Sequence, residues 1–352
     1  MLAALMNAKE PTPLPTPNAT LNERACGVPM PPLRQFLGPR HWPVWLAIGL
    51  MGVFAWVPWA WQRRLAQALG TLGWLLARRD RRTTAVNLRL CLPELALAEQ
   101  RRLARAHFAS LLQSLFETAA LWFRPNGRLA QSPVLAGREH LDAALQRGKG
   151  VLLVTAHFTT NEMAAAALGR AGLDADLMYK RSSSPLIQAF ALRQRLRQAS
   201  PATRLVPSEG LVEVLRSLKR NRVVLYAPDQ VYAGPGHLRV PFFGVPALCN
   251  PGITTIARAT GCAVLLYFPE RLPGTQGFVG HVLAPLPYFP STDAAADVQR
   301  YHRAIEEQVR HAPEQYLWSY KRFRPLPGEA DPYRNNLARG STGDGAQHKP
   351  KE

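Results

Sequence analysis

A histidine and a glutamate lie five positions apart in the stretch GVLLVTAHFTTNEMAAAALGR, residues 150–170. Imidazole is the usual general base near neutral pH, because its ordinary pKa is about 6.5. A carboxylate that is hydrogen-bonded to its second nitrogen fixes the tautomer and stabilises the imidazolium that forms. The H-x4-E spacing of His157 and Glu162 therefore predicts a general base with an acidic partner.

Both residues also have structural explanations. Thr159-x-x-Glu162 fits a capping box, in which the glutamate bonds back to the backbone at a helix start. His157 could equally be a satisfied buried histidine at a strand end. The motif is short enough to arise by chance, so these two residues alone leave catalysis and structure open.

The elements around the motif place it where α/β proteins carry their chemistry. Residues 151–155 are β-branched and aliphatic up to Thr155 and predict a short buried strand. Residues 161–171 predict a helix, because alanine, methionine and leucine lose little side-chain freedom there. His157 would then lie in a strand-to-helix turn, at the carboxyl end of the strand.

The rest of the chain alternates in the same way. Residues 84–123 are apolar at three-to-four spacing and predict helix. Further strands are predicted at 223–227, 262–268 and 278–284, and further helices at 185–198, 209–219, 250–260 and about 293–311. This alternation favours an α/β fold with a mainly parallel central sheet flanked by helices.

Residues 41–62 contain no charged side chain and predict a membrane anchor. A helix needs about 20 apolar residues to cross a bilayer core, and five of the eight tryptophans cluster towards the ends of this stretch. The prediction is a transmembrane or deeply inserted helix; a buried helix, or one lying in the interface, is the alternative. Six arginines follow, at 63, 64, 78, 79, 81 and 82. They predict a cytoplasmic position for the domain that follows and contact with anionic lipid.

Two tails are predicted. Seven prolines lie between Pro11 and Pro32, so residues 1–40 are expected to be a disordered tail. Glycine, proline and charge dominate residues 326–352, which are expected to be disordered as well. Residues 63–325 remain as the catalytic domain.

The formal net charge is +19 and the isoelectric point is about 10.6. This balance predicts an anionic partner, and charge alone does not choose among nucleic acid, anionic lipid and an acidic protein. The four cysteines show no CxxC spacing, which argues against a zinc site and a disulfide framework and favours a reducing compartment.

Three further segments follow the H-x4-E block: YKRSSSPLIQAFALRQRLR (179–197), VVLYAPDQVY (223–232) and RVPFFGVPALCNPGITTIARATGCAVLL (239–266). In this order, and with YLWSYKRFR at 316–324, the sequence resembles the lipid A biosynthesis acyltransferases, the lauroyl and myristoyl transferases of Gram-negative bacteria. The resemblance covers roughly residues 35–325. H-x4-E, APDQ and PFFG are its most specific parts.

The resemblance implies a member of the H-x4-[DE] glycerolipid acyltransferase superfamily at the cytoplasmic face of the inner membrane. Such an enzyme moves a fatty acyl chain from acyl carrier protein to the 3-hydroxyl of a hydroxyacyl chain on a lipid A precursor. His157 matches the family's base, Glu162 its partner, Arg195 the functional arginine and Asp229 the functional aspartate. Without the resemblance, Asp229 could be a turn residue after a proline, and Arg195 could be a charge on a helix surface.

Lys180 replaces an arginine of the family pattern and is followed by Arg181. Both are candidates to bind substrate phosphate, and solvated surface is the alternative. The resemblance implies no cofactor and no metal, because acyl carrier protein delivers the acyl chain as a co-substrate. Acyl carrier protein is acidic and the precursor carries phosphates, so a basic chain would attract both.

The expected partners are acyl carrier protein, the lipid A precursor and anionic inner-membrane lipid, without nucleic acid. One rival is an acyltransferase for another membrane acceptor, such as a lysophospholipid, ornithine lipid or glycolipid. A second rival is a membrane-tethered, non-enzymatic binder of nucleic acid or anionic lipid. It explains the charge but not the ordered motifs.

Overall fold

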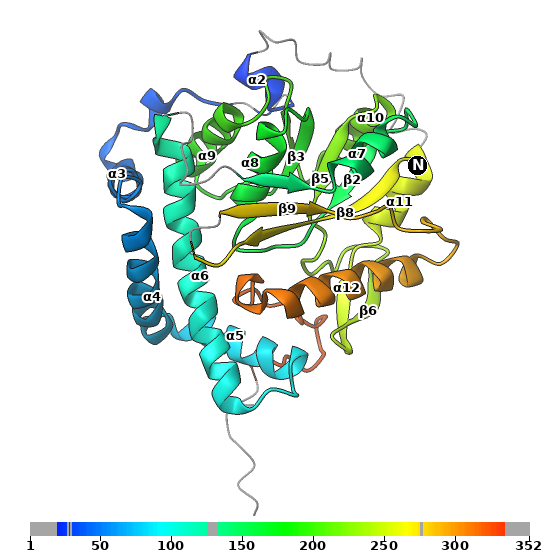
Figure 1. Cartoon of the computed structure of the whole chain (residues 1–352). Coiled ribbons are helices and arrows are strands. Elements are labelled where there is room, and N and C mark those ends of the chain that lie inside the picture. Colours follow the sequence, from blue (N-terminus) through cyan, green and yellow to red (C-terminus); the bar gives the residue numbers. More distant parts are fainter. Residues whose placement is uncertain (1–19, 27, 29, 126–132, 275–276, 335–352) are drawn as a thin grey trace, which may run out of the picture.

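A seven-stranded sheet runs through the computed structural model, which describes residues 20–26, 28, 30–125, 133–274 and 277–334 (Figure 1). The strands, in spatial order, are β1 (Val134–Ala136), β9 (Phe278–Val282), β8 (Ala263–Arg271), β2 (Val151–Val154), β5 (Val223–Tyr226), β3 (Ala175–Tyr179) and β4 (Arg204–Pro207). Neighbouring strands are parallel, except for the antiparallel pair of β8 and β9. A hairpin of β6 (Leu238–Phe242) and β7 (Val245–Cys249) stands apart from this sheet. The predicted α/β class with a mainly parallel sheet is confirmed.

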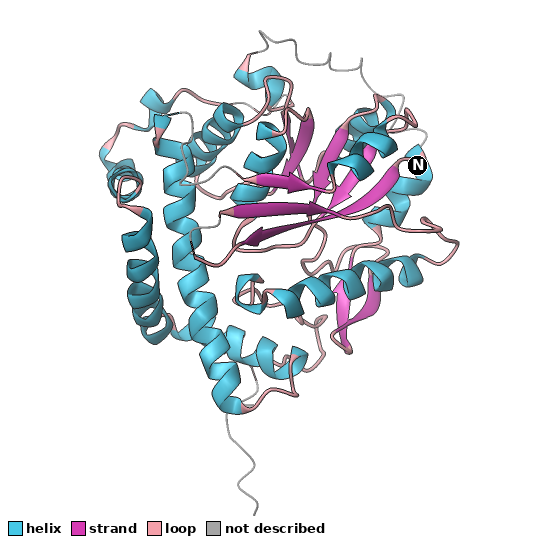
Figure 2. Cartoon of the chain, in the orientation of Figure 1, coloured by secondary structure: helices cyan, strands magenta, loops and turns pink. Residues whose placement is uncertain are grey.

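Helices cover both faces of the sheet (Figure 2). The helices on one face are α10 (Leu211–Lys219), α11 (Gly252–Thr260) and α12 (Ala294–His311), and those on the other are α7 (Arg138–Leu145), α8 (Asn161–Arg170) and α9 (Pro185–Gln198). Successive side chains of a strand point to opposite faces, so Leu152 and Val154 join the first core while Val151 and Leu153 join the second. All four are fully buried, which explains why β2 is an unbroken apolar run.

Several short strands were not predicted, and their charges explain why. β3 carries Asp176 and β4 begins at Arg204, two side chains that interrupt an apolar pattern although both are fully buried. Arg222 Nη2 donates to Asp176 Oδ1 at 2.5 Å, and Arg204 Nη2 donates to Glu213 Oε2 at 2.7 Å. Buried charges persist when they are paired in this way.

A further helical layer lies beside the sheet. It consists of α3 (Trp42–Phe54), α4 (Trp59–Leu76), α5 (Arg78–Cys91) and α6 (Leu97–Phe123). The long helix α6 lies against the body of the protein, and α3 and α4 pack on its outer side (Figure 1).

The single helix predicted for residues 41–62 is instead two helices. α3 has 13 residues and ends at Phe54, and Pro58 is the N-cap of α4. Proline lacks the N–H that a helix interior requires, so the chain breaks there. Among the described residues, no helix combines the length and the apolar character needed to cross a bilayer.

The folded part extends beyond the boundaries expected for the two tails. The described residues of this segment, 20–26, 28 and 30–41, include α2 (Leu21–Arg24) and two 3-10 turns, η1 (Leu33–Phe36) and η2 (Pro39–His41). Arg24 ties this segment to the body by donating to the carbonyls of Thr203 at 3.1 Å and Ser200 at 2.7 Å. Near the other end, Tyr333 is buried and donates to Asn87 Oδ1 at 2.7 Å. The tail predictions for residues 1–19 and 335–352 lie outside the described residues.

The contact between α4 and α6 is closest at Gly70, where a methyl group would lie 2.5 Å from the Cα of Ala109. Gly70→Ala should therefore lower the free energy of unfolding by about 1–3 kcal/mol, because the two backbones must separate. Gly73, on the same helix, has no atom nearer than 3.8 Å to such a methyl group. Gly73→Ala should raise the free energy of unfolding by about 0.5–1 kcal/mol through lower chain entropy. Denaturant unfolding of both variants measures the difference, and equal stabilities would contradict the close contact.

Candidate active site

His157 lies where the sequence predicts it, in the turn between β2 and α8. Asp229 follows β5 by three residues. β2 and β5 are adjacent and parallel, with Val154 opposite Tyr226. The loops after both strands therefore meet at the same edge of the sheet, the edge that open α/β sheets use for ligands and chemistry.

The imidazole of His157 is bonded to the carboxylate of Asp229. The distance from His157 Nδ1 to Asp229 Oδ1 is 2.5 Å, and the backbone N–H of His157 donates to Oδ2 at 2.9 Å. An ionised carboxylate only accepts, so Nδ1 carries the hydrogen in this pair. In the neutral ring, Nε2 then has the lone pair that can take a proton.

This pair shifts both pKa values. Burial lowers the pKa of His157, but the charge and hydrogen bond of Asp229 raise it by more, so it lies above its ordinary value of 6.5. Asp229 is 3% exposed, and burial raises its pKa, yet the charge and hydrogen bonds of His157 bring it below 3.8. The carboxylate therefore stays ionised, and its charge favours the protonated form of the imidazole.

The chain segment 315–322 holds this loop in place. The N–H of Leu317 donates to the carbonyl of His157 at 3.1 Å, and the N–H of Thr159 donates to the carbonyl of Gln315 at 2.8 Å. Arg322 is buried, donates to the carbonyl of Leu248 at 3.1 Å, and its positive charge helps to lower the pKa of Asp229. The aromatic and basic run at 316–324 stands out in the sequence. Nothing in the sequence alone indicates that this run contacts the loop of His157.

The sequence predicts a hydrogen bond between Glu162 and His157, but the carboxylate of Glu162 is bonded to Arg195 instead. Arg195 Nε donates to Glu162 Oε1 at 3.0 Å and to Oε2 at 3.3 Å, and Arg195 Nη2 also donates to Oε1. The predicted hydrogen bond between Glu162 and the imidazole is therefore wrong, because Asp229 occupies that position. The alternative capping box is not formed either, because the N-cap of α8 is Thr160, which makes no side-chain cap bond, and the Glu162 carboxylate accepts from Arg195.

One cavity, with a volume of about 480 Å³, brings most of the predicted residues together. His157, Glu162, Lys180 and Arg195 line it, and Asp229 is buried behind His157. The volume lies within the range of small-molecule sites. In the described part of the chain, no three His, Cys, Asp or Glu side chains are arranged to hold a metal ion.

Comparison with known proteins assigns the family. The sequence model of bacterial lipid A biosynthesis acyltransferases matches residues 30–325, most of the chain. The chain belongs to this family. It is therefore an acyltransferase, and the predicted resemblance is confirmed.

Named relatives agree with this assignment. The lipid A biosynthesis lauroyltransferase of Escherichia coli K12 is 31% identical over 83% of this chain and 94% of its own length. The palmitoleoyltransferase of the same organism is 28% identical over 85% of this chain and 97% of its own. A lipid A biosynthesis acyltransferase of Haemophilus influenzae is 24% identical over 84% and 95%.

The two basic residues after β3 occupy different positions in this acyltransferase. Lys180 lines the cavity of His157 and is exposed. Arg181 is half exposed, and its Nε lies 3.6 Å from Glu209 Oε2 at the surface. The geometry therefore keeps Lys180 as a candidate for substrate contact and places Arg181 outside the set of cavity-lining residues.

The partner of His157 can be tested by titration. Asp229→Asn should lower the pKa of His157, because the charge that raises it is lost while the burial that lowers it remains. Glu162→Gln removes a carboxylate of the same cavity but keeps the bond between His157 and Asp229, so the pKa of His157 should stay close to that of the wild type. NMR titration of the imidazole nitrogens gives both values. A larger decrease of the His157 pKa in Glu162→Gln than in Asp229→Asn would show that Glu162 is the partner of His157.

Proposed function

We propose that this acyltransferase transfers a fatty acyl chain from acyl carrier protein to the 3-hydroxyl of a hydroxyacyl chain on a lipid A precursor. The observation that carries the proposal is the His157–Asp229 pair, 2.5 Å between Nδ1 and Oδ1, at the wall of a cavity of about 480 Å³. Family membership and the names of the relatives support the acceptor class.

His157 acts as the general base. A secondary hydroxyl is a weak nucleophile, so Nε2 of His157 removes its proton as the oxygen attacks the thioester carbon. Asp229 holds the tautomer and stabilises the imidazolium that forms. When the tetrahedral intermediate collapses, the C–S bond breaks and His157 returns the proton to the departing thiolate. The new ester forms without a covalent acyl-enzyme and without a metal or cofactor.

The negative charge on the thioester oxygen needs a separate stabiliser. Arg195 is engaged by Glu162 through two of its nitrogens, which makes it a positioning residue for the cavity wall. The first turn of α8 lines the same cavity through Asn161 and Glu162. We place the developing oxyanion near this helix start, where the helix dipole favours negative charge.

Charge supports the expected partners. Lys180 lies where it could meet a phosphate of the precursor, as a point charge at the edge of the cavity. The net charge of +19 favours approach of an acidic carrier protein and of anionic lipid.

Exposed apolar side chains support attachment to the membrane. Leu46 is 75% exposed, Val53 67% and Trp56 63%, and no charged residue lies between positions 41 and 62. We propose that α3 and the start of α4 lie in the cytoplasmic leaflet of the inner membrane as interfacial helices. Arg63 and Arg64 follow at the level of anionic headgroups.

The activity can be measured with purified protein, an acyl carrier protein donor and a lipid A precursor. The product should gain one acyl chain by mass spectrometry, faster than with the same chain on coenzyme A. His157→Ala should lower kcat by about 10²–10⁴-fold, the usual contribution of acid–base catalysis. It should also lower the melting temperature, because the buried carboxylate of Asp229 loses the imidazole, so the assay is run at a temperature at which circular dichroism shows the variant to be folded. His311→Ala, at a histidine whose side chain is 64% exposed, is the matched control and should retain activity. A higher kcat/KM with a lysophospholipid acceptor would overturn the proposed substrate, and full activity of His157→Ala would overturn the proposed base.

Membrane attachment has its own test. The triple variant Leu46→Ser, Val53→Ser, Trp56→Ser should bind neutral vesicles at least tenfold more weakly in flotation at high salt. Burying one large apolar side chain contributes about 1.5–3 kcal/mol, and high salt screens the electrostatic contribution. Tyr288→Ser, at a tyrosine that is 94% exposed on the loop before α12, should bind like the wild type. Unchanged flotation of the triple variant would place the membrane contact elsewhere.

A further inference from the structure

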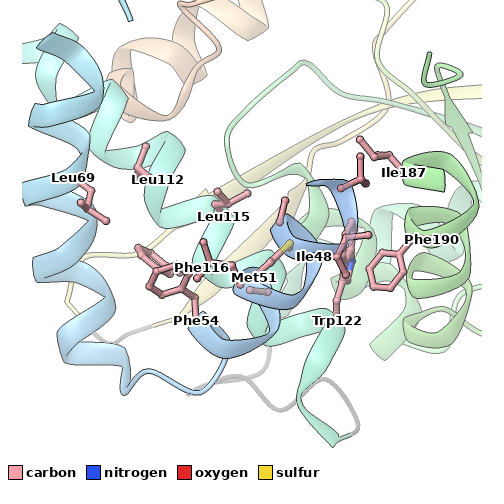
Figure 3. Close-up of a pocket in the computed structure, with 14 residues that line it drawn as sticks. Ile48, Met51, Phe54, Leu69, Leu112, Leu115, Phe116, Trp122, Ile187 and Phe190 are labelled. Atoms are coloured by element: carbon pink, nitrogen blue, oxygen red, sulfur yellow. The ribbon is translucent and has the colours of Figure 1, made fainter. Parts of the chain in front are cut away.

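An apolar groove lies on the outer side of α6, separate from the cavity of His157. It has a volume of about 410 Å³, and α3, α4, α6 and α9 form its walls. Figure 3 shows its labelled side chains extending from Leu69 on α4 at one end to Phe190 on α9 at the other, with Met51 of α3 between them. No charged side chain lines it.

Shared lining residues place the groove close to the reaction centre. Trp122 lines both the groove and a small pocket that also contains Glu162 and Arg195. Those two side chains in turn line the cavity of His157. A ligand in the groove thus has its inner end near the Glu162–Arg195 pair.

Helix α6 separates the two sites. Leu111, Ser114 and Thr118 face the cavity of His157. Leu112 and Phe116, on the adjacent arc of the helix, line the groove. The indole N–H of Trp122 is buried and finds no acceptor within the described chain.

We propose that this groove binds an acyl chain of the membrane-borne acceptor, an inference that rests on the proposed function. Leu50 lines the groove and is 53% exposed, on the same helix as the outward-facing Leu46 and Val53. The groove therefore opens on the apolar surface assigned to the membrane. A chain that is already in the bilayer can enter it laterally without crossing water.

The donor chain fits the groove less well. Its carrier is water-soluble and acidic, and Lys180 presents an exposed positive charge in the lining of the His157 cavity. An entry through the groove would require this charged protein to press against the apolar surface of α3. The acceptor's chain is therefore the occupant to which the geometry points.

The test blocks the groove from α3. Ala47 lines the groove and is exposed, so Ala47→Trp should fill it without disturbing the core. Leu46→Trp, one position away and 75% exposed, does not line the groove and is the matched control. The probes are soluble phosphorylated acceptor analogues with acyl chains of increasing length, used below their micelle-forming concentration and without donor.

The Kd of the wild type should fall by about fourfold for each added methylene group, which corresponds to about 0.8 kcal/mol. Ala47→Trp should lose most of this length dependence, while Leu46→Trp should keep it. The same chain-length dependence in Ala47→Trp as in the wild type would overturn the proposal. So would a change in the donor-chain dependence of kcat/KM in Ala47→Trp, because it would assign the groove to the donor. Since binding is measured without turnover, a wild type that binds with this length dependence but transfers nothing would refute the proposed function and leave the groove supported.

Discussion

The buried carboxylate of Asp229 is the constraint on which the site depends. An unpaired carboxylate at this depth would cost several kcal/mol, and it is stabilised by two donors from one residue, the imidazole and the backbone N–H of His157. Both bonds require the loop after β2 to lie against the loop after β5, which is possible because these strands are adjacent in the sheet. The carbonyl of His157 is held from the other side by Leu317. The loop after β2, the loop after β5 and the segment of Leu317 are distant in the sequence, and together they fix the imidazole ring of His157.

The charges around the cavity are arranged in compensating pairs. Asp229 is paired with His157 and Glu162 with Arg195, while Arg322 stabilises Asp229 from the interior. Lys180 lines the cavity and is exposed. In the proposed reaction the thioester and the hydroxyl are neutral, so they can lie beside the paired side chains without leaving either carboxylate without its partner. The charge that develops during the reaction then has preorganised groups to meet it.

The sequence predicted the strands and helices that carry this site, but not which carboxylate bonds to His157. β2, β5, α8 and α9 were recognisable because their apolar patterns match their burial. The choice between Glu162 and Asp229 as the partner of His157 depended on strand order, which local spacing does not contain: Glu162 is five residues away and Asp229 is 72. β3 and β4 were not predicted because Asp176 and Arg204 interrupt their apolar patterns, and the partners that neutralise these charges lie outside the strand itself. The helix predicted for residues 41–62 is too long, because Pro58 interrupts the helix although no charged residue marks a boundary there.

The break at Pro58 also explains how the apolar layer can serve the site. A continuous helix through residues 41–62 would carry its exposed leucines and tryptophans along one axis and away from α6. The break instead lets α3 and α4 both pack on α6, so that the apolar surface lies along the protein at the mouth of the groove. Under the proposed function, the acceptor comes from the bilayer and the donor chain from water, so the two entrances belong on different sides of one wall. α6 provides that wall, with Phe116 turned towards the groove and Thr118 towards His157.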